Sequence, residues 1–122
     1  MSWLLILSLV TALPPAPPSV QGFISTEDLT VLCAPQNDSP ALCLGYLVGA
    51  VDQLLAGQAR RPATRRTICP PANLSAEAVQ TALLLRLGRD RANRPQAAAD
   101  AIRQAVEAEY ACPLGAGVRP GR

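Results

Sequence analysis

Residues 39–57 read SPALCLGYLVGAVDQLLAG, and this stretch predicts the longest helix of the chain. Ser39 is a residue type that caps helices, and Pro40 suits the first helical position because its missing N–H costs nothing there. Apolar side chains then recur every three or four residues, which places them on one face of a helix. These residues are Leu44, Leu47, Val48, Val51, Leu54 and Leu55. We expect Gly57 to end the helix.

Three further helices are predicted on either side of this one. The first begins after Ser25, where Asp28 completes a capping box, and it ends near Cys33. The third is capped by Ser75 and stops at Gly88, and the fourth opens at Pro95 and ends near Cys112. Their apolar faces are formed by Ala76, Val79, Leu83, Leu84, Leu87, Ala98, Ala101, Ile102, Ala105 and Val106. The fold expected is all-α, a small four-helix domain stapled by disulfides.

The N-terminal segment is typical of a signal peptide. Residues 3–13 are an apolar run that is too short to span a bilayer, and a proline-rich stretch follows at residues 14–18. We predict a signal peptide over residues 1–22, with cleavage after Gly22, and hence no membrane contact after cleavage. Residues 23–113 form the predicted domain, and residues 114–122 are predicted to be a disordered tail.

The cysteines indicate an oxidising compartment. Cys33, Cys43, Cys69 and Cys112 make an even number in a short exported chain, which is typical of two disulfides. No pair has a Cys-x-x-Cys spacing and the chain has no histidine, so we expect no metal site, no cofactor and no redox catalysis. In an up-and-down bundle, Cys33–Cys43 with Cys69–Cys112 is the favoured pairing. Cys33–Cys112 with Cys43–Cys69 is the main alternative.

Charge and catalytic potential are both limited. Eleven basic residues, all arginine, stand against nine acids, for a net charge of +2. Aromatic residues are too few and too scattered for the stacking that nucleic-acid binding uses, so no nucleic-acid partner is expected. Without histidine, neither a Ser–His nor a Cys–His nucleophile is possible. The chain is therefore predicted not to be an enzyme.

Two surfaces are candidates for binding a partner protein. The long loop between the second and third helices, residues 58–71, carries Arg60, Arg61, Arg65 and Arg66. Loops this long in small domains are often functional, although a run of arginines is also typical of a solvated loop. We expect residues 58–67 to insert into a partner's cleft.

The second candidate surface lies on the long helix, around Gly45, Tyr46, Gly49 and Asp52. Glycine weakens a helix by about 1 kcal/mol relative to alanine, so two glycines four residues apart need a compensating gain. Close packing inside the molecule is the favoured explanation, in which case a bulky residue at Gly49 damages folding. Contact with a partner, including a homodimer, is the alternative.

Several short segments resemble the Rap/Tai family of type VI secretion immunity proteins. They are residues 23–29 (FISTEDL) leading to Cys33, residues 43–46 (CLGY) with Gly49 and Asp52, residues 68–70 (ICP), the capped helix from Ser75, and residues 110–112 (YAC). The resemblance implies a small all-helical periplasmic protein that binds a secreted peptidoglycan amidase effector and blocks it sterically. A function from another class remains open, that of a small periplasmic chaperone or envelope stress protein that binds several clients.

Overall fold

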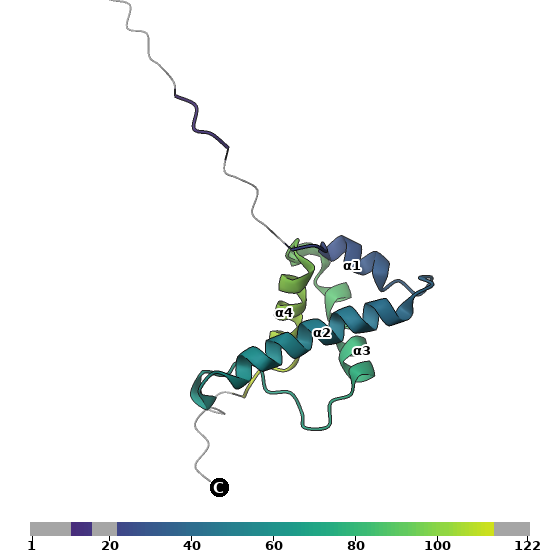
Figure 1. Cartoon of the computed structure of the whole chain (residues 1–122), viewed down its shortest axis with the longest axis vertical. Coiled ribbons are helices and arrows are strands. Elements are labelled where there is room, and N and C mark those ends of the chain that lie inside the picture. The colour runs from purple at the N-terminus through teal and green to yellow at the C-terminus, as the bar shows by residue number, and fades with distance from the viewer. Residues whose placement is uncertain (1–10, 16–21, 114–122) are drawn as a thin grey trace, which may run out of the picture.

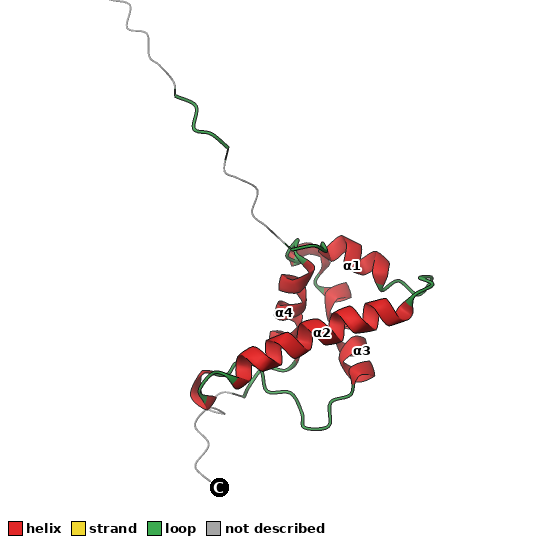
Figure 2. Ribbon diagram, viewed as in Figure 1, coloured by secondary structure: helices red, strands yellow, loops and turns green. Residues whose placement is uncertain are grey.

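A computed structural model describes residues 11–15 and 22–113 of the chain. Its helices are α1 (Thr26–Leu32), α2 (Pro40–Ala59), α3 (Ala76–Arg89) and α4 (Ala98–Glu109), with short 3₁₀ turns η1 (Ala63–Arg65) and η2 (Arg91–Asn93) (Figures 1 and 2). The described part contains no strand, only two isolated β-bridges, so the all-α prediction is confirmed. Most of the predicted signal peptide and the whole predicted tail lie outside the described residues.

Helix α1 begins as its sequence predicts. The Ser25 hydroxyl accepts a hydrogen bond from the Asp28 backbone N–H at 3.0 Å, and an Asp28 carboxylate oxygen accepts one from the Ser25 backbone N–H at 3.2 Å. These bonds complete the capping box. The side-chain and backbone hydrogen bonds from Ser25 lower the pKa of Asp28.

Helix α2 begins at Pro40 as predicted, but its C-terminal end and its N-terminal cap differ from the prediction. The helix continues through Gly57 to Ala59. Gly57 does not adopt the positive φ that commonly ends a helix, and the next residue, Gln58, is held in the last turn. The backbone carbonyl of Gln58 accepts hydrogen bonds from the Arg61 N–H at 3.0 Å and from Arg66 Nε at 3.2 Å. At the other end Ser39 makes no side-chain cap. Instead, the side-chain oxygen of Asn37 accepts a bond from the Ser39 N–H at 2.8 Å.

Helix α4 starts three residues later than predicted, at Ala98 rather than Pro95. The reason is that the backbone around Gln96 is paired with the segment before α1. Thr26 N–H donates to the Gln96 carbonyl at 2.7 Å, and Ala98 N–H donates to the Ile24 carbonyl at 3.0 Å. A hydrogen bond from the Thr26 hydroxyl to the Pro95 carbonyl reinforces this pairing.

The core is organised around α4, which contacts α1, α2 and α3. The alanines on its inner face are small, so the neighbouring helices approach it closely. In Figure 1, α2 crosses in front of α3 and α4. The largest fully buried side chains come from all four helices: Leu29, Leu47, Leu83, Ile102 and Val106. On α2 only Cys43, Leu47 and Val51 are buried, and the rest of the predicted stripe is half-buried.

Two disulfides join the elements in the favoured pairing. Cys33–Cys43 links the end of α1 to the start of α2, with a Cα–Cα distance of 5.0 Å. Cys69–Cys112 links the segment after η1 to the residues that follow α4, with a Cα–Cα distance of 4.8 Å. The alternative pairing of the same four cysteines is wrong.

Helix α2 is apolar enough, by length and composition alone, to cross a membrane, with a mean hydropathy of 1.3. In the structure it contacts α1, α3 and α4, and Cys43 ties it to α1. We therefore interpret α2 as a core helix of the domain.

Candidate partner-binding surfaces

Residues 58–67, the arginine loop, form an ordered turn at the C-terminal end of α2. The side-chain oxygen of Gln58 accepts hydrogen bonds from the backbone N–H groups of Thr67 at 2.8 Å and Ile68 at 3.2 Å. These bonds close the loop across its base, and the 3₁₀ turn η1 shapes its tip. The long loop predicted between the second and third helices therefore has a defined backbone in this part.

The far end of the arginine loop is fastened to the C-terminus of α4. Cys69 N–H donates to the Tyr110 carbonyl at 2.7 Å, and Cys112 N–H donates to the Thr67 carbonyl at 3.1 Å. The Cys69–Cys112 disulfide crosses the same place, and Ile68 beside it is buried. Burial and the neighbouring charge of Glu109 raise the pKa of Tyr110. The loop thus projects from a rigid base.

The four arginines of the loop are all exposed, but they do not play the same part. Arg66 Nε donates to the backbone carbonyls of Gln58 and Arg61, both at 3.2 Å, so this side chain holds the loop together. Arg60, Arg61 and Arg65 have no side-chain hydrogen bond or ion pair to the described residues. No acidic residue occurs between positions 58 and 71. Three uncompensated positive charges are therefore available to a partner.

The second predicted surface is exposed, and the packing interpretation of its glycines is wrong. Gly45, Gly49 and Asp52 all face solvent on α2. A Cβ atom added at Gly45 or Gly49 meets nothing within 4 Å, so neither glycine serves close packing inside the molecule. Tyr46, in contrast, is half-buried and packs against the core. Asp52 lies at the edge of a hollow of about 310 Å³ between α2 and residues 70–76.

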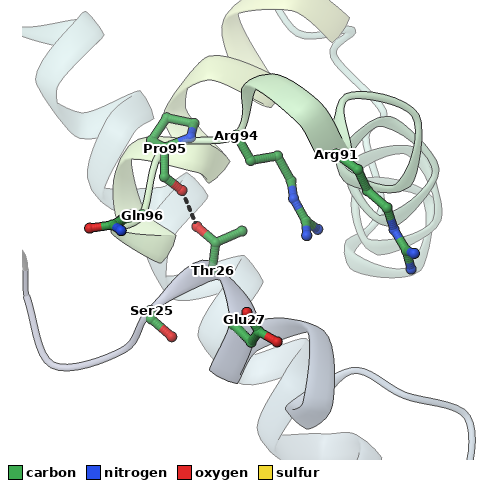
Figure 3. Close-up of a pocket in the computed structure, with 7 residues that line it drawn as sticks. All are labelled: Ser25, Thr26, Glu27, Arg91, Arg94, Pro95 and Gln96. Atoms are coloured by element: carbon green, nitrogen blue, oxygen red, sulfur yellow. Dashed lines mark hydrogen bonds between the residues drawn. The ribbon is translucent and has the colours of Figure 1, made fainter.

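A third surface lies in the segment between Gly88 and Pro95, to which the sequence assigned no role. In the structure, η2 and the residues after it meet α1, and a hollow of about 400 Å³ forms between them. Figure 3 shows its lining, with Arg91 and Arg94 on one side and Glu27 on the other. The signal that could have found it is the close spacing of Arg89, Arg91 and Arg94 before the proline.

Nothing in the described residues is arranged for metal binding. No group of three or more His, Cys, Asp or Glu side chains is close enough to hold a metal ion there. The ion pairs of the described part, Arg86–Glu109 at 3.0 Å and Arg103 with Asp100 and Glu107 at 3.5 Å each, lie on exposed or half-exposed helix faces. They have the character of surface salt bridges.

Comparison with known proteins gives one match. A family described as Rap1a immunity proteins matches residues 21–112. The matched range contains all four helices and all four cysteines. No curated protein and no solved structure is significantly similar to the chain.

Proposed function

Because the chain belongs to the Rap1a immunity protein family, we propose that it binds a peptidoglycan amidase effector of type VI secretion and blocks it in the periplasm. The family match over residues 21–112 is the observation that carries this proposal, since it implies an effector immunity function. Immunity proteins are typically inhibitors without enzymatic activity of their own. The amidase, the secretion system and the compartment are the further steps that we propose.

Two features support a periplasmic location. Two disulfides persist in an oxidising compartment and are rare in the cytosol. The apolar run at residues 3–13, followed by prolines, has the pattern of a signal peptide. Peptidoglycan amidases act in the same space, so an inhibitor must be exported to meet its target.

The proposed inhibition is steric, with the arginine loop as the inserted element. Blocking an amidase requires peptidoglycan to be excluded from a cleft, and a projecting loop enters a cleft better than a helix face does. The Gln58 and Arg66 hydrogen bonds order this loop before binding, which lowers the entropic cost of association. Arginine is over-represented among the residues that dominate interface energies, and its planar group pairs well with carboxylates.

We also propose that the exposed face of α2 around Gly45 and Gly49 is the contact in a homodimer. The two glycines leave a flat surface on which a second copy can approach closely, and neither glycine is used inside the molecule. Sedimentation velocity of the wild type and of Gly49→Leu tests this, because a leucine at the contact should shift the protein to monomer. An unchanged sedimentation coefficient for Gly49→Leu would contradict the assignment.

The experiment that tests the proposed function uses a candidate Cys–His amidase effector of type VI secretion. When that effector is directed to the periplasm of a test strain, co-expression of the full chain should restore growth. The same protein lacking residues 1–22 should fail to protect, because it stays in the cytoplasm. Failure of the full chain to restore growth, or binding to many unrelated proteins instead of one effector, would favour the chaperone function.

The interface assignment is tested by a triple variant, Arg60→Ala, Arg61→Ala and Arg65→Ala. Arg66 is kept because it holds the loop backbone. We expect inhibition to weaken at least about tenfold while the melting temperature is unchanged, since three interface arginines are lost but no internal contact is. Arg103→Ala, an exposed arginine on α4, serves as the control. Unchanged inhibition by the triple variant would show that the loop is not the contact.

A further inference from the structure

Two adjoining hollows beside η2 share the same two arginines. The first, of about 400 Å³, has a polar lining that includes Ser25, Glu27 and Gln96. The second, of about 420 Å³, lies between α1, the α1–α2 connection and the end of α3. Arg91 and Arg94 line both hollows. The two hollows and the arginines between them are named here the η2 groove.

The second hollow has an apolar floor. Leu29 from α1 and Leu84 and Leu87 from α3 contribute to it, and Ala34 and Pro35 close one side. Arg91 and Arg94 are the only charged residues in its lining. The hollow therefore suits an apolar side chain that stands next to a negative charge.

The arginines are placed to receive that charge. Arg94 is half-buried, and its Nη1 donates to the Thr30 hydroxyl at 3.3 Å and to the Leu87 carbonyl at 3.5 Å. Its Nη2 and Nε groups donate no hydrogen bond to any described residue, so they are available to an acceptor on a ligand. Arg91 is exposed, and Figure 3 shows both side chains extending in the same direction from one short segment.

The charges around the groove do not cancel one another. Glu27 lines the opposite wall of the first hollow, but no ion pair within 4.0 Å joins it to Arg91 or Arg94 in the described part. Arg86 and Arg103, by comparison, pair with acids of α4. The apolar hollow thus carries two positive charges and no negative one.

The groove is also held in shape before any ligand arrives. Cys33, which lines the apolar hollow, is bonded to Cys43 of α2. Asn37 N–H donates to the Ala34 carbonyl at 3.0 Å, which fixes the turn that carries Pro35. A preformed site loses less entropy on binding than a flexible one.

From these features we propose that the η2 groove binds an acidic surface segment of a partner protein, in which a bulky apolar side chain stands next to aspartate or glutamate. The apolar side chain occupies the hollow floored by Leu29, Leu84 and Leu87, and the carboxylate accepts hydrogen bonds from Arg91 and Arg94. The identity of that partner as the effector rests on the proposed function, whereas the recognition chemistry does not. The chain's own residues 114–122 carry two arginines and no acid, so their charge does not fit.

The test is a titration of the ¹⁵N-labelled protein, purified from the periplasm, with two blocked hexapeptides. One has two aspartates between two leucines, and the matched peptide has asparagines in their place. We expect the aspartate peptide to shift the amide signals of Leu84, Leu87 and Arg91. The asparagine peptide should bind about tenfold more weakly, because its hydrogen bonds to the arginines carry no charge.

Variants separate this proposal from simple loss of folding. Arg91→Gln removes a side chain without internal contacts, and it should reduce binding of the aspartate peptide about tenfold. Arg89→Gln, at an exposed position two residues earlier that lines neither hollow, should leave binding unchanged. Equal shifts with both peptides, or shifts away from the groove, would overturn the proposal. So would groove shifts that appear when the protein concentration alone is raised, since a second copy would then be the occupant.

The two proposals fail separately. Peptide binding in the groove without inhibition of the amidase would leave the recognition chemistry standing and contradict the proposed function. Inhibition of the amidase with no peptide binding in the groove would support the proposed function and contradict the recognition chemistry.

Discussion

Replacing Gly45 and Gly49 with alanine should stabilise the protein. Both residues lie inside the longest helix, and neither has a positive φ. An added methyl group meets nothing within 4 Å at either position, so no steric cost opposes the change. Alanine is favoured over glycine by about 0.8–1.0 kcal/mol in a helix interior.

The expected gain follows from the two sites together. The sites do not share a packing partner in the molecule, so the double variant should gain about 1.6–2 kcal/mol in the free energy of unfolding. For a domain of this size each kcal/mol raises the melting temperature by roughly 4–8 °C. Urea unfolding followed by circular dichroism, at low protein concentration so that association does not contribute, measures the gain directly.

A matched control comes from the same helix. Ala56 is exposed on α2, and Ala56→Gly should destabilise the protein by up to about 1 kcal/mol for the same reason with opposite sign. If the double alanine variant were instead less stable than wild type, the glycines would be in close contact with something inside the molecule. That result would refute the reading of this face as open.

Three further predictions concern stability. Replacing the Cys69–Cys112 pair with serines should lower the free energy of unfolding by about 4 kcal/mol, and replacing Cys33–Cys43 should lower it by about 3 kcal/mol. The sequence separations are 43 and 10, and the longer loop loses more entropy on closure. Equal melting temperatures for the two variants would contradict this. Thr26→Val should cost about 1–3 kcal/mol by leaving the Pro95 carbonyl without its donor, whereas Thr26→Ser, which keeps the hydroxyl, should cost less in the same denaturation assay. The pKa of Asp28 is lowered in the folded state, so its contribution to stability is present above the ordinary aspartate pKa of 3.8 and is lost as the pH falls through the folded pKa. The melting temperature of Asp28→Asn should therefore depend less on pH below 3.8 than that of the wild type. An unchanged pH dependence would count against the capping box.

Most of the helical pattern can be predicted from local residues. Ser25 and Ser75 cap their helices as expected because the residues they need lie within three positions along the chain. Chain order also favours the observed disulfide pairing over its alternative, since Cys33 and Cys43 flank a single turn. Such features depend on near neighbours, which a sequence displays directly.

The errors arise where distant residues meet. The start of α4 moved because the backbone near Gln96 pairs with Ile24 and Thr26, about seventy positions away. Gly57 failed to end α2 because Gln58 is held by contacts from the arginine loop. The glycines of α2 were assigned to packing because helical spacing cannot tell which face the other helices cover.

The candidate site was only partly predictable for the same reason. The arginines at positions 60–66 stand out in the sequence, but the structural part played by Arg66 depends on where the carbonyls of Gln58 and Arg61 point. The η2 groove needs α1 and α3 brought side by side, and no local pattern indicates that meeting.

The central claim, that this chain is a periplasmic inhibitor of an amidase effector, is tested most directly by an inhibition assay with purified components. The protein is titrated into the amidase effector against which it protects in the growth assay, and release of peptidoglycan stem peptides is measured. We predict complete inhibition near one equivalent, with inhibition weakened at least about tenfold by the Arg60, Arg61 and Arg65 triple alanine variant. Undiminished amidase activity at a large excess of correctly folded, disulfide-bonded protein would contradict the claim.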